Sequence, residues 1–300
     1  MLNLIKPKRL VAGDTIATVS LSWGGAGDED IRWRYFQGKE RLEKVFGLKV
    51  VEMPHTLAGT EFVYAYPHKR AQDLMNAFKD PSIKGGLSSF YGMSVLNDFA
   101  ENVEMSDYSI EWINKVLFSG EVIGEIPTSK QWTSQRLEWI IENKHMRRQF
   151  EANTGYELIQ GSQTVRGRLI GGCMEVIEYI KGTSLFPSAD CFDDAILFLE
   201  TSEVLPPVWF MEDTLRNYGM MGILKRLNGI IFGKPQGNQF YEEYKPILKQ
   251  VLAEFGLENM PVLYNASFGH NEPKCYMPYG ALAEINCERK SFSILESGVL

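Results

Sequence analysis

Asp14-Thr-Ile-Ala-Thr-Val-Ser-Leu-Ser-Trp-Gly-Gly-Ala-Gly27 is the stretch that decides the fold of this 300-residue chain. Its β-branched first half predicts a strand, and the glycines that follow predict a loop. A helical pattern over 29–46 comes next, and then a second strand over 48–53 and a second helix over 68–78. Strands and helices that alternate in this way predict a parallel sheet covered by helices. The N-terminal part is therefore expected to be α/β.

The pattern is interrupted after Lys79-Asp-Pro-Ser-Ile-Lys84. In a doubly wound sheet this segment should lead into a buried strand of several consecutive apolar residues. Only Ile83 stands before Gly85-Gly-Leu-Ser-Ser-Phe-Tyr-Gly92. The strand is therefore expected to be missing or severely shortened, with an internal deletion near 84/85.

The C-terminal half has strand and helix signals of its own. Strands are expected over 165–170, 195–200, 229–233 and 261–264, and helices over 173–180, 208–218 and 240–255. Between the halves lies a polar, aromatic stretch with a basic cluster at Lys144-His-Met-Arg-Arg148. We predict an N-terminal α/β domain over 1–125, a linker and substrate loop over 126–163, and a C-terminal domain over 164–300.

Composition excludes several classes of protein. A formal charge of -7 and the lack of a basic run argue against a nucleic-acid polymer as partner. The four cysteines have no Cys-x-x-Cys pair and no histidine at zinc-finger spacing, so neither a metal knuckle nor a disulfide framework is predicted. No stretch approaches the roughly 20 apolar residues of a membrane span, and residues 1–10 do not resemble a secretion signal. We expect a cytoplasmic protein that does not enter a membrane.

Two residues at strand ends are candidates for acid–base chemistry. Glu200 ends an apolar strand, and His270 lies in the glycine-bearing loop Ala266-Ser-Phe-Gly-His-Asn271. A neutral imidazole acts as a directed base when an acceptor on its other nitrogen fixes its tautomer, and a carboxylate supplies that acceptor. The alternatives are a strand-end Glu200 that faces solvent or pairs with Arg216 or Lys225, and a surface histidine.

Trp132 is a candidate ligand-binding residue because it lies in the polar segment Gln131-Trp-Thr-Ser-Gln-Arg-Leu-Glu-Trp139, where an exposed aromatic side chain can stack on a base. Packing in the core or in a dimer is the alternative. The glycines of Trp23-Gly-Gly-Ala-Gly27 and Gly171-Gly172 match no nucleotide-binding motif and are typical of turns after strands. No Gly-x-Ser-x-Gly sequence is present, so an α/β-hydrolase is not indicated.

Five blocks together resemble the LD-carboxypeptidase family of serine peptidases, and most of all its microcin C immunity branch. They are Val19-Ser-Leu-Ser-Trp-Gly-Gly-Ala-Gly27, Gly47-Leu-Lys-Val-Val-Glu-Met-Pro-His55, Gly167-Arg-Leu-Ile-Gly-Gly172, Leu197-Phe-Leu-Glu-Thr-Ser202 and Ser267-Phe-Gly-His270. They occur in the family's order over nearly the whole chain. The resemblance implies a flavodoxin-like N-terminal domain, here shortened, and a C-terminal α/β domain with a small β-barrel-like sheet.

The resemblance also implies a function. Glu200 and His270 match the carboxylate and base of a Ser-Glu-His triad, and the Trp132 segment is similar to a loop that stacks on the nucleobase of an aminoacyl-nucleotide. The implied activity is hydrolysis of an amide bond in LD-muropeptides or in peptidyl- or aminoacyl-nucleotides. The family consists of cytosolic homodimers that need no metal or cofactor, so none is expected.

The chain departs from the family where the nucleophile should be. The family's elbow-borne serine, its helix and the oxyanion-hole turn have no counterpart between Lys84 and Gly85, so a few tens of residues are gone. Ser88 and Ser89 are the nearest serines, but they match a strand downstream of the elbow. We therefore expect an inactive relative of a serine carboxypeptidase. The alternatives are a non-catalytic binder of an adenylate-like or peptide ligand, and a deletion that is not natural.

Overall fold

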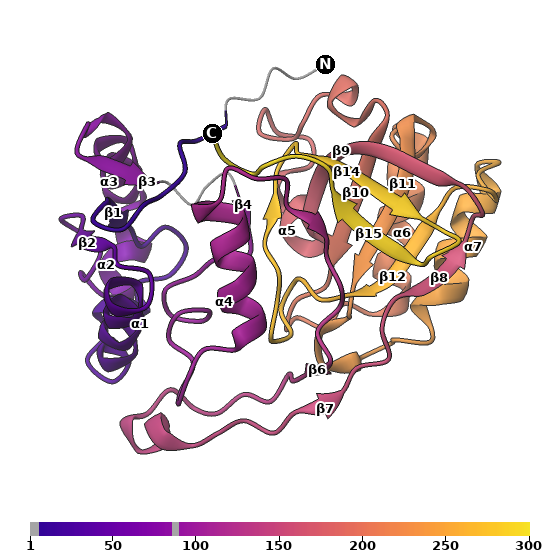
Figure 1. Cartoon of the computed structure of the whole chain (residues 1–300). Helices are drawn as coiled ribbons and strands as arrows, with labels where there is room; N and C mark the ends of the chain where they lie inside the picture. Colours follow the sequence, from indigo (N-terminus) through magenta and orange to yellow (C-terminus); the bar gives the residue numbers. More distant parts are fainter. Residues whose placement is uncertain (1–5, 86–89) are drawn as a thin grey trace. The chain divides into compact units, whose positions relative to one another are not determined.

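The computed structural model describes residues 6–85 and 90–300 of the chain, which fold into two compact units. The smaller unit comprises 6–119, 136–148 and 299–300, and the larger one comprises 120–135 and 149–298. The segment predicted as a linker, 126–163, is thus divided, since its middle packs with the smaller unit and its two ends with the larger. Figure 1 shows the chain coloured along the sequence.

The smaller unit contains a three-stranded parallel sheet in the order β2-β1-β3. Its strands are β1 (Thr15–Thr18), β2 (Lys49–Glu52) and β3 (Ile83–Gly85). The helices of this unit are α1 (Arg32–Lys44), α2 (Thr60–Ala65), α3 (Pro67–Lys79) and α4 (Asp107–Ile113), and the two-residue strand β4 (Phe90–Tyr91) also belongs to it. Pro67 begins α3 at a position where its missing N–H costs no hydrogen bond.

The strand expected after α3 is β3. β3 has three residues and pairs with β1 through two registered positions. Ser88 and Ser89 lie outside the residues that the structure describes. The α/β class that the sequence predicts is confirmed by this sheet and by the larger one.

The larger unit is built on an eight-stranded mixed sheet in the order β5-β15-β14-β9-β10-β11-β12-β8. The four strands β9 to β12 run parallel, and the outer strands run antiparallel to their neighbours. The bounds are β5 (Gly124–Glu125), β8 (Glu157–Gln160), β9 (Thr164–Cys173), β10 (Ala195–Glu200), β11 (Leu227–Gly233), β12 (Val262–Ala266), β14 (Leu282–Asn286) and β15 (Ser291–Ile294). The antiparallel strands β14, β15 and β5 continue this sheet where we expected a barrel-like part.

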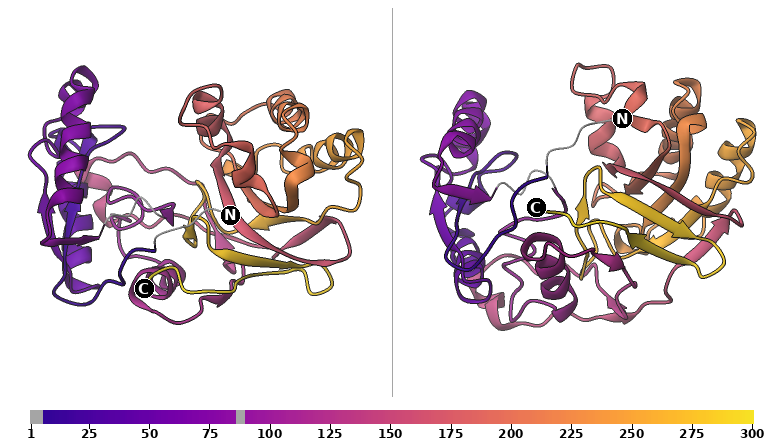
Figure 2. Two further views of the ribbon diagram at one scale, coloured as in Figure 1. Left: turned by 90° about the horizontal axis from the view of Figure 1, so that it is seen from above. Right: turned by 45° about the horizontal axis from the view of Figure 1, so that its top comes forward.

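Helices α5 (Met174–Ile180), α6 (Val208–Met220) and α7 (Tyr244–Glu254) pack on the parallel strands (Figure 2). Alternate residues of β10, among them Leu197 and Leu199, join helix residues such as Leu215 and Leu248 in one apolar core. All six residues of β10 are buried, because neighbours cover both faces of this central strand. The buried strand therefore fixes the position of its last residue, Glu200.

In the larger unit, β6 (Gln131–Trp132) and β7 (Glu151–Ala152) form a short antiparallel pair, and β13 (Met277–Pro278) follows the loop after β12. Among the described residues, every helix is too short or too polar to traverse a lipid bilayer. All four cysteines are free thiols.

Candidate functional site

The candidate site lies at the carboxyl ends of two neighbouring parallel strands. Cys173 ends β9, Glu200 ends β10, and the two residues are direct partners in the strand register. The strands approach closely at Gly171, where a Cβ atom would lie 1.8 Å from the carbonyl oxygen of Phe198. Glycine is therefore required there, and the close pairing brings the two strand-end side chains together.

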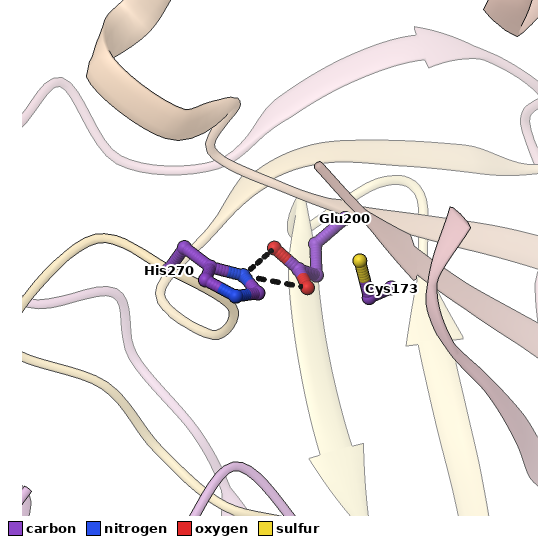
Figure 3. Close-up of side chains that lie close together, drawn as sticks. All are labelled: Cys173, Glu200 and His270. Carbon is purple, nitrogen blue, oxygen red and sulfur yellow. Dashed lines mark hydrogen bonds and ion pairs between the residues drawn. The ribbon is translucent and has the colours of Figure 1, made fainter. Parts of the chain in front are cut away.

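His270 reaches the same point from the loop that follows β12 (Figure 3). Its Nδ1 lies 3.0 Å from Oε1 and 2.9 Å from Oε2 of Glu200, so the N–H donates to the carboxylate. Gly269 makes this approach possible, since its φ is +106° and a Cβ there would lie 2.6 Å from Glu200 Oε2. The proximity of Glu200 and His270 that the sequence predicts is confirmed.

The environment of this pair favours a positively charged imidazole. Glu200 is fully buried, whereas the side chain of His270 is 34% exposed. Burial lowers the pKa of His270, but the hydrogen bond and the negative charge of Glu200 outweigh it, and the pKa lies above its ordinary value. The Nε2 atom lies 3.3 Å from Oε2 of Glu203, a second carboxylate that the sequence analysis did not single out.

The structure also adds Cys173, which the sequence did not single out as a site residue. Its side chain is buried, and Sγ donates to Oε2 of Glu175 at 3.3 Å. Oε1 of Glu175 in turn accepts from the backbone N–H and the hydroxyl of Ser202. Burial, followed by the charges of Glu200 and Glu175, raises the pKa of Cys173, so the group is a thiol at neutral pH and a poor nucleophile.

Trp132 is buried, which corrects the expectation of an exposed aromatic side chain in a polar loop. The ammonium of Lys234 lies over its ring, 4.6 Å from the centroid, and at 4.6 Å from the ring centroid of Tyr241 as well. Burial lowers the pKa of Lys234 to about 8. The prediction was wrong because the residues around Trp132 are polar, whereas β6 places the Trp132 side chain itself in the protein interior.

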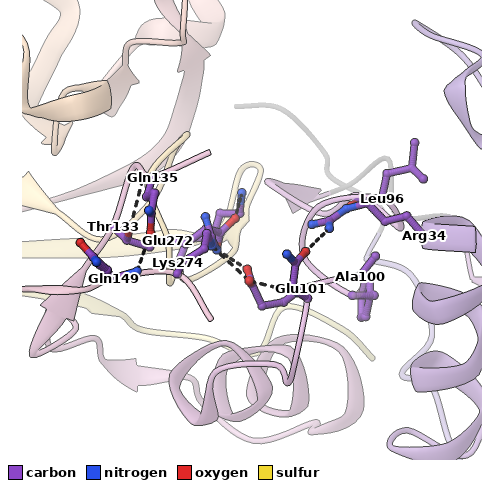
Figure 4. Close-up of polar contacts among 12 residues, drawn as sticks. Arg34, Leu96, Ala100, Glu101, Thr133, Gln135, Gln149, Glu272 and Lys274 are labelled. Atoms are coloured by element: carbon purple, nitrogen blue, oxygen red, sulfur yellow. Dashed lines mark hydrogen bonds and ion pairs between the residues drawn. The ribbon is translucent and has the colours of Figure 1, made fainter. Parts of the chain in front are cut away.

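Hydrogen bonds tie the Trp132 segment to the loop that carries His270. Thr133 and Glu272 exchange two backbone hydrogen bonds of 2.7 and 2.9 Å (Figure 4), and the backbone N–H of Ser129 donates to the hydroxyl of Ser267. These bonds hold the tryptophan and the histidine in one framework.

Asn271 anchors the other side of the loop. Its Nδ2 donates to the carbonyl oxygens of Lys234 and Pro235, at 2.8 and 2.9 Å, and its Oδ1 accepts from the backbone N–H of Gly237. This buried amide fixes the residue next to His270 against the turn that follows β11. The imidazole is thus held by its neighbour as well as by Glu200.

This arrangement can orient an imidazole and stabilise its protonated form, which are the tasks of the base and carboxylate in a hydrolytic triad. Within 6–85 and 90–300, the residues that contact the ring nitrogens of His270 are Glu200 and Glu203, and no serine hydroxyl is among them. The geometry supports a general base.

Comparison with known protein families matches the chain in two parts. Residues 16–110 match the LD-carboxypeptidase N-terminal domain, and residues 166–285 match the LD-carboxypeptidase C-terminal domain. The second match includes Cys173, Glu200 and His270.

Curated relatives are carboxypeptidase-like proteins. A putative carboxypeptidase of Treponema pallidum is 26% identical over 260 residues, which cover 86% of this chain and 69% of the relative. The microcin C7 self-immunity protein MccF of Escherichia coli is 27% identical over 222 residues, and the match spans 71% of this chain and 60% of MccF. A putative carboxypeptidase of Synechocystis is 24% identical over 320 residues, covering 98% of each chain.

Solved structures resemble the chain over nearly its full length. An MccF-like protein of Streptococcus pneumoniae in complex with AMP is 28% identical, with a TM-score of 0.84 over 94% of this chain and 98% of that one. MccF in complex with aspartyl sulfamoyl adenosine is 22% identical, with a TM-score of 0.80 over 99% of this chain and all of the other, which shows a shared fold.

Proposed function

The chain belongs to the LD-carboxypeptidase family, and from this membership we propose that it is a carboxypeptidase-type protein that binds an aminoacyl- or peptidyl-nucleotide without hydrolysing it. Glu200 and His270 would be the carboxylate and the base of the ancestral triad. The observation that carries the proposal is the hydrogen bond between them, combined with a second ring nitrogen that faces Glu203 rather than a hydroxyl.

The loss of hydrolysis is supported by the shortened sheet of the smaller unit. The described part of this sheet has three strands, and the sequence predicts a deletion near β3. The alignment with the Synechocystis relative runs over 320 residues, more than the 300 residues of this chain, so at least 20 of its positions have no counterpart here. The loss of about this many residues at one point would remove a serine elbow and the helix behind it.

The choice of ligand is supported by the neighbours and by Lys234. The S. pneumoniae protein was crystallised with AMP, and MccF with an aminoacyl sulfamoyl nucleoside. In this chain, the buried ammonium of Lys234 has Asn238 Oδ1, at 3.4 Å, as its hydrogen-bond partner, and no described carboxylate forms an ion pair with it. A phosphate near Trp132 would supply the negative charge that this cation lacks.

Ligand binding tests the proposal directly. AMP and aspartyl sulfamoyl adenosine should bind the purified full-length chain in calorimetric titrations, and Trp132→Ala should weaken binding roughly 5- to 150-fold if the indole stacks on the base. Trp209→Ala is the matched control, because Trp209 is 62% exposed on α6. Since Trp132 is buried, Trp132→Phe provides a second variant that keeps a ring in the core. No binding at all would rule out the nucleotide-binding role, and equal affinities for wild type and both Trp132 variants would show that Trp132 serves in packing.

We also propose that the protein is a cytoplasmic homodimer, as the family resemblance implies. Four free thiols are consistent with a reducing compartment. Sedimentation equilibrium of the purified chain distinguishes a dimer of 34.1 kDa subunits from a monomer.

A further inference from the structure

Three side chains of the types that bind transition metals converge where β9 and β10 end. Cys173 Sγ, a carboxylate oxygen of Glu200 and a ring nitrogen of His270 all lie within 4.8 Å of one another (Figure 3). We propose that this Cys173–Glu200–His270 cluster binds a zinc-like divalent cation through the thiolate, the carboxylate and Nδ1, with a fourth position open to water. The proposal goes beyond the proposed function, because it requires neither a nucleophile nor a nucleotide.

The spacing of the three ligand atoms suits a small tetrahedral ion. Zinc binds sulfur at about 2.3 Å and imidazole nitrogen or carboxylate oxygen at about 2.0–2.2 Å, so two ligand atoms on one ion lie roughly 3.3–3.7 Å apart. The imidazole and the carboxylate are already 2.9–3.0 Å apart. Side-chain adjustments of about 1 Å would bring the thiol to the same ion, and the backbone would stay in place.

The mixture of donor atoms selects the class of metal. One thiolate, one imidazole and one carboxylate suit zinc and similar borderline ions, whereas magnesium and calcium take oxygen ligands. Three protein ligands with a free fourth position are typical of zinc sites that accept water or a small ligand. Sequence spacing could not reveal this site, since its members are 27 and 70 positions apart and the sheet alone brings them together.

Charge balance permits a divalent ion in this buried cluster. The carboxylates of Glu200 and Glu175 lie on either side of the Cys173 thiol, and the Nδ1–H of His270 donates to Glu200. On binding, the cation replaces the thiol proton and the Nδ1 proton, both of which leave to solvent, so the cysteine becomes a thiolate and the imidazolium a neutral ring. Two carboxylates with an imidazolium sum to -1, and two carboxylates with a thiolate and the ion also sum to -1, so the ion adds no net charge to the buried cluster.

One residue next to the cluster already provides an outer partner for a ligand. With Nδ1 on the metal, the Nε2–H of His270 faces Oε2 of Glu203 at 3.3 Å, an arrangement that orients metal-bound histidines in many proteins. Glu175 accepts the thiol hydrogen of Cys173, a bond that is lost when the proton leaves, and it keeps its two hydrogen bonds from Ser202. The ion would enter past His270, the one ligand whose side chain is partly exposed.

Metal binding and base chemistry exclude each other here. Nδ1 cannot bind an ion and donate a hydrogen bond to Glu200 at the same time. A bound cation would therefore break the Glu200–His270 hydrogen bond, so that this site holds either an oriented base or a metal.

Cobalt is the probe for the test, because a thiolate bound to Co²⁺ gives an intense near-ultraviolet absorption band. The full-length chain, first treated with a chelator, is expected to take up one equivalent of Co²⁺ with this band, and Zn²⁺ should displace it. Cys173→Ser should abolish the band. Cys191→Ser is the matched control, since Cys191 is a free thiol of the same unit whose Sγ forms a hydrogen bond with the hydroxyl of Ser188.

A second variant covers the case in which Cys173→Ser does not fold. Glu203→Gln should keep the band and weaken Co²⁺ binding about 10-fold, as expected when an outer partner of a metal-bound histidine loses its charge. A wild-type chain without a thiolate band, or a band unchanged in a folded Cys173→Ser protein, overturns the proposal. Nucleotide titrations leave this result unaffected, so failure of the metal site and failure of the proposed function can be told apart.

Discussion

Cys173 and Glu200 are direct partners across β9 and β10, each as the last residue of its strand. This relationship explains why one thiol among four lies beside the Glu200–His270 pair. Parallel strands that are in register end at the same edge of the sheet, and residues at that edge are supported by a rigid frame. The predictions below concern this edge and the two units that the chain forms.

Hydrolysis is expected to be absent from the wild-type protein. Triad members act as a unit, so loss of the nucleophile should reduce turnover of LD-muropeptides or aminoacyl-nucleotides by about 10⁶-fold relative to an intact family member. Steady-state assays with both substrate classes provide the measurement. A chain that receives the missing segment from a relative is the positive control. Labelling of Ser88 or Ser89 by a serine-directed probe, lost in His270→Ala, would show that a nucleophile exists after all.

Gly269→Ala should destabilise the larger unit more than Gly182→Ala does. Both glycines have positive φ, +106° and +82°, so either substitution introduces backbone strain of about 1–2 kcal/mol. A Cβ at Gly269 would also meet Glu200 Oε2 at 2.6 Å, whereas nothing lies within 4 Å of one at Gly182. We expect an additional loss of about 1–3 kcal/mol from the clash. Urea unfolding measures the loss of stability in both variants. Equal losses in Gly269→Ala and Gly182→Ala would mean that the Glu200 side chain can move away from the added Cβ.

Lys234 should make stability rise with pH. Its pKa is about 8 in the folded protein because burial disfavours the charged form, and the unfolded chain therefore holds more protons between pH 8 and the ordinary lysine pKa of about 10.4. The destabilising effect of the buried charge is full below pH 8 and fades as pH rises through this window. The free energy of unfolding of Lys234→Met should not show the increase with pH that the wild type shows in this window.

Lys245 provides the contrasting control for that measurement. Burial lowers the pKa of Lys245, but the ion pairs with Glu157 and Glu242 outweigh it and the pKa is raised. The charged side chain therefore stabilises the folded protein at neutral pH, and this stabilisation is lost when the pH rises above the folded pKa. Lys245→Met should therefore lower stability at pH 7. Free energies of unfolding measured from pH 7 to 10.5 show whether each lysine makes stability rise or fall with pH. Parallel curves of unfolding free energy against pH for wild type and Lys234→Met would contradict a lowered pKa of Lys234.

Amide exchange should be faster in the small sheet than in the large one. β3 is a three-residue edge strand, and short edges have few neighbours to protect their hydrogen bonds. Ile196–Leu199 lie in the middle of eight strands with every side chain buried, so their amides should exchange slowest. Hydrogen exchange with mass spectrometry tests the order. Uniform protection across both units would show that the small sheet is stabilised in some further way.

The local sequence predicted most of the regular structure. The expected strand over 195–200 is β10, and the expected helices over 208–218 and 68–78 fall on α6 and α3. Period-two and helical patterns carry this information along the chain. The hairpin of β14 and β15 was not predicted, because its short, half-buried strands show a weak alternation that is clear only beside β9.

The sequence by itself determined the family, the α/β class and the two residues Glu200 and His270, because five blocks that resemble the family keep its order along the chain. Only the tertiary structure decided what surrounds them. It placed Cys173 beside Glu200, turned Glu203 toward the imidazole and buried Trp132 under Lys234. These are contacts between segments far apart in sequence, and they follow from strand register and loop closure, which no local pattern encodes.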